Sequence, residues 1–103
     1  QMNKGILEGC VMKLVKTEYR CPAEIVDAMR TAGFAEFSEG TLYTMLLRLE
    51  KEGCFATKRQ TTRNSPPKKF YRLSESGRAR LEQFYRLWTS TAQNVAKIFD
   101  DEE

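Results

Sequence analysis

Six basic residues gather between Phe55 and Leu73, a stretch that contains no acidic residue. They are Lys58, Arg59, Arg63, Lys68, Lys69 and Arg72. The chain of 103 residues has a net charge of +3, and outside this stretch acidic residues outnumber basic ones. The positive charge is therefore local. Lysine and arginine side chains clustered in this way neutralise phosphate groups, so the cluster predicts a contact with nucleic acid.

The sequence has few residues suited to catalysis, metal binding or disulfide formation. The sequence has no histidine, which removes the commonest general base and metal ligand. Its three cysteines, Cys10, Cys21 and Cys54, form no Cys-x-x-Cys pair, so neither a zinc site nor a disulfide framework is indicated. We expect no enzyme, no metal and no cofactor, and we expect the cysteines to be small buried hydrophobic residues. A small enzyme or redox sensor that uses a cysteine is the weakest alternative.

The basic cluster lies in a predicted β-hairpin, 57–72, with strands at 55–60 and 69–73. Residues 61–68, Thr-Thr-Arg-Asn-Ser-Pro-Pro-Lys, have the composition of a loop. This connection is longer than a tight turn, so we expect its tip to project and to move. The predicted DNA contacts of the hairpin are Lys58, Arg63, Lys68, Lys69 and Tyr71.

A capped helix precedes the hairpin. Ser38 is a good N-cap, Gly53 ends the helix, and leucines at 42, 46 and 49 have the spacing of a core-facing stripe. Hydroxyl groups, a tyrosine and an arginine remain for the rest of its surface, where they can bind phosphates or base edges. The predicted DNA contacts of this helix are Ser38, Glu39, Gly40, Thr41, Tyr43, Thr44 and Arg48.

Two more helices and a long last one complete the order. We expect a first helix over 3–16 and a second one that Cys21-Pro22 opens and Gly33 stops; 35–37 has the character of a short strand. Helix, helix, helix, hairpin and long helix predict a mainly α fold with a small β-hairpin. Residues 1–73 would form a winged helix-turn-helix, and 74–103 a C-terminal dimerisation helix, packed as one unit.

The last helix, 75–99, begins after the N-cap Ser74, and Gly77 is expected to weaken its first turn. Its apolar residues recur at spacings of three and four, which favours a homodimer interface. The predicted interface or ligand residues are Leu81, Phe84, Tyr85, Trp88, Val95 and Ile98. Trp88 suits two roles, dimer core and stacking platform for a planar ligand, and the two can coexist.

Two segments resemble a known family. Residues 38–53, SEGTLYTMLLRLEKEG, are similar to the recognition-helix signature of PadR-type regulators, named for the phenolic acid decarboxylase repressor. Residues 66–77, PPKKFYRLSESG, are similar to the wing of that family and its exit into the last helix. The resemblance implies a dimeric transcriptional repressor whose last helix crosses its mate and packs against the partner's first helix.

The short chain resembles the small branch of the family, which includes a lactococcal multidrug-binding regulator with a drug-stacking tryptophan where Trp88 stands. This implies a small planar aromatic effector at the dimer interface. Two features depart from the pattern. Tyr19-Arg20-Cys21-Pro22 replaces a Tyr-Gly-Tyr-type start of the second helix, and Phe84 and Tyr85 crowd the turn that carries Trp88.

The predicted function is thus a dimeric DNA-binding regulator, a repressor, with a two-fold double-stranded operator and release by a planar aromatic ligand. The alternative is a winged-helix protein–protein interaction module whose basic hairpin meets an acidic partner. No apolar run is long enough to span a membrane and no signal peptide is visible, so we expect no membrane partner and a cytoplasmic location.

Overall fold

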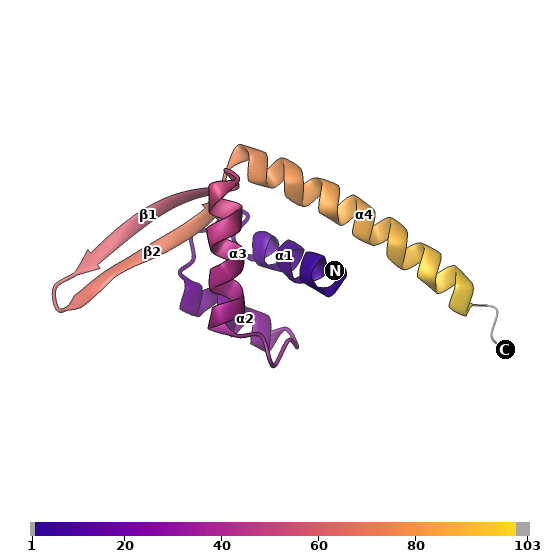
Figure 1. Ribbon diagram of the computed structural model, residues 1–103, viewed down its shortest axis with the longest axis horizontal. Coiled ribbons are helices and arrows are strands. Elements are labelled where there is room, and N and C mark those ends of the chain that lie inside the picture. The colour runs from indigo at the N-terminus through magenta and orange to yellow at the C-terminus, as the bar shows by residue number, and fades with distance from the viewer. Residues whose placement is uncertain (1, 101–103) are drawn as a thin grey trace.

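The computed structural model describes residues 2–100 and folds them into four helices and one β-hairpin (Figure 1). In chain order the elements are α1 (Met2–Leu14), α2 (Pro22–Thr31), α3 (Glu39–Lys51), β1 (Phe55–Thr62), β2 (Ser65–Leu73) and α4 (Glu75–Phe99). The first three helices gather at the centre, the hairpin projects to one side and α4 extends to the other, over a longest extent of 62 Å. The predicted fold class is confirmed. Residues 101–103 of the predicted segment 74–103 lie outside the described residues.

Helix α2 ends, as predicted, at a glycine. Gly33 has a φ of +122°, and the Phe34 N–H donates to the Met29 carbonyl at 3.1 Å, which closes the helix end. The prediction of a short strand at 35–37 is wrong. These residues form a turn, because the buried Phe37 side chain holds the segment to the core and its carbonyl accepts from Arg30 Nε at 2.8 Å.

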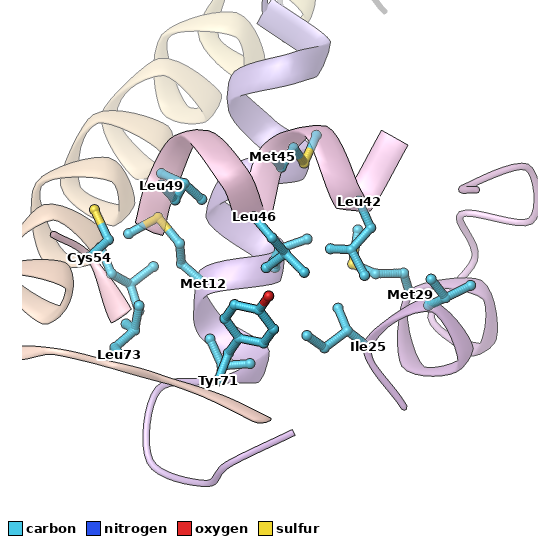
Figure 2. Close-up of a cluster of buried hydrophobic side chains, with 14 of the residues drawn as sticks. Met12, Ile25, Met29, Leu42, Met45, Leu46, Leu49, Cys54, Tyr71 and Leu73 are labelled. Carbon is cyan, nitrogen blue, oxygen red and sulfur yellow. The ribbon is translucent and has the colours of Figure 1, made fainter. Parts of the chain in front are cut away.

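Helix α3 begins at the predicted cap, where the Ser38 hydroxyl accepts from the Thr41 N–H at 3.1 Å. Four side chains of α3 enter the core: Leu42, Met45, Leu46 and Leu49. Figure 2 shows them meeting side chains from α2, the α1 helix and β2, with Ile25, Met12 and Leu73 among them. Burial of this one side of α3 fixes which side faces solvent.

The hairpin is longer and tighter than predicted. Strand β1 pairs antiparallel with β2 from Phe55 opposite Leu73 to Gln60 opposite Lys68, and then from Thr62 opposite Ser65. Only Arg63 and Asn64 remain between the strands, so the expected long loop is wrong. Pro66 and Pro67 belong to β2 instead. The outer edge of β2 pairs with Arg20 at Tyr71, farther from the tip, and the strand register is irregular between Gln60 and Thr62. Edge strands and register irregularities both tolerate a proline, which lacks an N–H.

Helix α4 is held to the rest of the chain at its beginning, and its later apolar side chains are largely exposed. The Ser74 hydroxyl accepts from the Gly77 N–H at 3.1 Å, Leu81 is buried in the core, and Phe84 packs on Gly9 of α1. The C-terminal part of α4 extends away from the other elements (Figure 1). Within residues 2–100, no helix combines the length and apolar character needed to cross a bilayer.

Gly77, expected to be a weak point, is required by close packing. A Cβ atom there would collide with the backbone carbonyl oxygen of Cys54, which already accepts from the Ser74 N–H at 2.9 Å. We predict that Gly77→Ala lowers the free energy of unfolding by about 1–3 kcal/mol, because backbone must shift to admit the methyl group. Urea unfolding followed by circular dichroism measures this.

Gly5→Ala is the matched control. Gly5 also lies in a helix, but a Cβ atom there meets nothing within 4 Å. Alanine should raise the free energy of unfolding at this position by about 0.5–1 kcal/mol, because it favours the helix. Equal unfolding midpoints for Gly77→Ala and wild type would contradict the close approach of α4 to Cys54.

Candidate nucleic-acid interface

One row of residues on α3 faces away from the core. Gly40, Thr44, Leu47 and Lys51 follow one another at helical spacings of four and three, and all four are exposed. We call them the outward row. Tyr43 borders this row and is 61% exposed. Leu47 and Lys51 were missing from the predicted contacts, although their spacing from Gly40 and Thr44 was a readable signal.

The start of α3 carries the hydroxyl groups that the sequence predicted for DNA contact. Ser38 Oγ donates to Thr41 Oγ1 at 3.0 Å as well as accepting from the Thr41 N–H, and Thr44 Oγ1 donates to the Gly40 carbonyl at 3.2 Å. Glu39 is exposed beside them in the first turn. These bonds order the polar groups of the helix start while their remaining lone pairs face solvent.

Arg48 lies on the side of α3 that faces α1 and α4. Its guanidinium pairs with Glu8 of α1 and, at 3.4 Å, with Glu52, which accepts from Arg80 of α4 at 2.5 Å. The hydrogen bond from Arg80 is the main cause that lowers the pKa of the Glu52 carboxyl. Arg48 and Glu52 together therefore link α3 to α1 and α4, and a contact of Arg48 with a base edge would require it to leave these partners.

The strand register gives the hairpin two faces, because directly opposed residues share a face. Arg59 and Lys69 share the face of Tyr71, which packs on the core, whereas Lys58 and Lys68 belong to the other face. The Lys69 ammonium donates to the two Glu50 carboxylate oxygens at 2.8 and 2.9 Å, which raises its pKa. This pair joins the hairpin to α3.

The outer face of the hairpin carries stacked cations. Lys58 Nζ lies 4.5 Å from the centre of the Tyr19 ring, and the Arg72 guanidinium lies 4.6 Å from the same ring. Lys58 stays exposed. Arg63 and Lys68 are exposed near the tip, and neither forms an ion pair with another residue in the described range 2–100. Arg59 on the opposite face is likewise exposed and has no ion pair among the described residues, so these three cations are available to an external phosphate.

Tyr71 is a correction to the predicted contacts. It is 6% exposed, and its ring packs edge-on against Phe55 with ring centres 5.2 Å apart. Burial is the main cause that raises the pKa of its hydroxyl. The backbone of Tyr71 also exchanges hydrogen bonds with Arg20 at 2.9 and 3.0 Å. Tyr71 thus has little surface to offer DNA, and it holds the hairpin to the core.

The six predicted interface residues on α4 fall into two groups. Leu81 is buried and Phe84 half-buried within the chain itself, against the core and α1. The others are exposed, and Trp88 is 41% and Ile98 73% exposed. The exposed set is Tyr85, Trp88, Val95 and Ile98, to which Leu87 and Phe99 add further apolar surface.

The cysteines lie where small hydrophobic residues belong. Cys21 and Cys54 are buried, and Cys10 is half-buried with a thiol pKa that burial raises. A thiol with a raised pKa is a poor nucleophile. In the part of the chain that the structure describes, no cluster of three or more histidine, cysteine, aspartate or glutamate residues could hold a metal ion.

Together, these residues build a surface suited to the DNA backbone and groove. An exposed helix face lies beside a hairpin with free cations, while the opposite side of the helix is fixed by the core. A helix has the width that the major groove admits, and cations on an adjacent hairpin are placed to neutralise phosphates.

Comparison with known proteins agrees with this geometry. Residues 11–83 match the family model described as the transcriptional regulator PadR-like family. A PadR-like transcriptional regulator from Bacillus cereus has a TM-score of 0.87 at 30% identity, with 99% of each chain covered. A Streptococcus transcriptional regulator has a TM-score of 0.85 at 33% identity, covering 95% of this chain and 96% of that one.

A third structure contains DNA. The Bacillus subtilis PadR in complex with operator DNA has a TM-score of 0.70 at 20% identity, and the match covers 78% of this chain and 46% of that one. At this identity the likeness concerns the fold.

Proposed function

The chain belongs to the PadR-like family of transcriptional regulators, and we propose that it binds operator DNA as a homodimer, with α3 in the major groove and the hairpin as a wing. The family agrees with the prediction that the chain is a transcriptional regulator and not an enzyme. The observation that carries the DNA-binding proposal is the exposed outward row of α3 beside the free cations of the hairpin.

We assign specificity to α3. Tyr43 and the outward row are exposed and rigidly placed by the core, and the hydroxyl-rich helix start, Ser38 to Thr41, is suited to phosphates. Arg48 takes a secondary place, because its pairs with Glu8 and Glu52 compete with a DNA contact. Its removal should weaken operator binding and also loosen the junction of the three helices.

We assign most of the affinity to the wing. Lys58, Arg63 and Lys68 are exposed cations, and each phosphate they neutralise releases counterions. Lys69 contributes less directly, because Glu50 already holds its ammonium group. The neighbouring Pro66 and Pro67 stiffen the tip and so lower the entropy lost when it binds.

We assign dimerisation to α4. Its 25 residues span about 37 Å, and the apolar stripe beyond Phe84 is largely exposed among the described residues 2–100. We propose that the same stripe of a second copy covers it, because a two-fold axis brings the same surface of both copies together. The dimer would place two α3 helices against half-sites about one helical turn, roughly 34–36 Å, apart.

We further propose that the dimer is a repressor and that a planar aromatic ligand releases it. Trp88 lies in the middle of the exposed stripe, with Tyr85 and the half-buried Phe84 one turn away. Aromatic rings so gathered at a dimer axis offer stacking surfaces, and a ligand seated there would alter the separation of the two α3 helices.

The DNA contacts make a salt prediction. Lys68→Ala should weaken binding to a selected operator and reduce the slope of log affinity against log salt by about two for the dimer, one phosphate contact per chain. Tyr43→Ala should weaken binding about tenfold through the lost groove contact. Fluorescence anisotropy between 50 and 300 mM salt, with slopes taken on the order of 0.9 per contact, measures both.

Lys97→Ala is the matched control for charge, since Lys97 is exposed at the end of α4 farthest from the hairpin (Figure 1). It should leave both affinity and slope unchanged. Absence of binding to every DNA fragment at low salt would refute the proposal and favour the protein–protein module.

The dimer makes a prediction about mass. Wild-type protein should elute with twice the 11.9 kDa chain mass in light scattering at micromolar concentration. Val95→Glu should shift it toward the monomer, because two carboxylates would be buried across the axis. Gln93→Glu, on the polar side of the same helix, should remain dimeric. A monomeric wild type would contradict the interface.

The ligand proposal can be read from one fluorophore, because Trp88 is the single tryptophan of the chain. Planar aromatic compounds should quench its emission and weaken operator binding. Trp88→Leu keeps an apolar side chain, so it should stay dimeric and bind DNA without responding to these compounds. Unchanged emission across the panel, with a normal effector response in the Trp88→Leu protein, would rule the platform out.

A further inference from the structure

We propose that Leu47 selects operators by packing its side chain against the C5-methyl group of a thymine in the major groove. This inference rests on the proposed DNA-binding function and names a residue that reads sequence within it. The sequence-based contacts did not include Leu47.

Leu47 departs from the other leucines of α3. Leu42, Leu46 and Leu49 are at most 1% exposed, whereas Leu47 is 53% exposed. Tyr43 lies four residues before Leu47, on the preceding turn of the helix. The two exposed side chains together form an apolar ridge on an otherwise polar surface.

The flanks of α3 show which way Leu47 faces. On one side Glu50 pairs with Lys69 of the hairpin, and on the other Arg48 pairs with Glu8 of α1. Leu47 lies between these two sides in the outward row, away from α1, α4 and the core. Its position is therefore that of a reading residue, and it lies on a different helix from the apolar stripe of α4.

The chemistry of the groove supplies a matching partner. The thymine methyl is the apolar group on the major-groove edges of the bases, whose other groups are hydrogen-bond donors and acceptors. An aliphatic side chain gains from burying that methyl and gains little against the polar edges. Thr44 and Lys51, the neighbours of Leu47 in the outward row, have polar groups for the adjacent base edges or phosphates.

Replacement of thymine by uracil tests this directly, because uracil pairs identically and lacks only the methyl group. We would select an operator from random DNA and prepare it with thymine or with uracil. For wild-type protein, affinity should fall about fourfold for each contacted methyl, the worth of one buried carbon. Single thymine-to-uracil changes then locate the contacted position in each half-site.

Leu47→Ala should bind the thymine operator more weakly and should lose the discrimination, with a thymine-to-uracil affinity ratio near one. Alanine favours the helix and Leu47 is exposed, so the fold should be kept, as circular dichroism would show. Lys51→Ala is the control on the same row. It should weaken binding to both operators by the same factor and leave the ratio of the wild type.

The outcomes separate the two proposals. Equal affinity of wild-type protein for both operators would overturn the role of Leu47 while leaving DNA binding intact. The same loss on uracil in wild type and Leu47→Ala would also overturn it, because the methyl would then act through another residue or through DNA shape. Failure of every selection would refute DNA binding itself and this inference with it.

Discussion

The burial of one side of α3 is the constraint on which the rest of the structure depends. Four side chains of α3 lie in the core: Leu42, Met45, Leu46 and Leu49. Because an α-helix has 3.6 residues per turn, their burial determines which residues of α3 face solvent on the opposite side. The outward row, including Leu47, is exposed because those four residues are not. The orientation of α3 therefore determines both core packing and the surface proposed to bind DNA. A rotation of α3 that exposed other residues to DNA would also expose core leucines to solvent.

Ion pairs on both flanks connect this helix to the parts that give it a role. Glu50 holds Lys69 of the hairpin, and Glu52 accepts from both Arg48 and Arg80, the latter on α4. Exposed pairs of this kind add little to stability, because solvent screens them, so their main effect is to orient the elements. In the proposed dimer, a change in the crossing angle of the two α4 helices would be transmitted to α3 through the Arg80–Glu52 ion pair.

The sequence predicted the order of the elements because caps and periodicity are local signals: Ser38 and Gly33 act as foreseen. It failed where tertiary contacts decide. Pro66 read as a loop residue, but a two-stranded ribbon has edges that accept it. Tyr71 read as a surface contact and is buried by Phe55 and the core. Arg48 read as free, because its partner Glu8 lies forty positions away in the chain. The dimer stripe of α4 and the DNA contacts of α3 stay predictions, because both involve a second molecule.

The central claim is that α3 reads DNA while α4 sets the distance between two copies of it. Selection of bound sequences from random double-stranded DNA tests both halves together. The account predicts one enriched motif with two-fold symmetry and half-sites about one helical turn apart, near 34–36 Å between centres. A single enriched half-site without a symmetric mate would contradict the dimer, and a pool with no enriched sequence would contradict reading by α3.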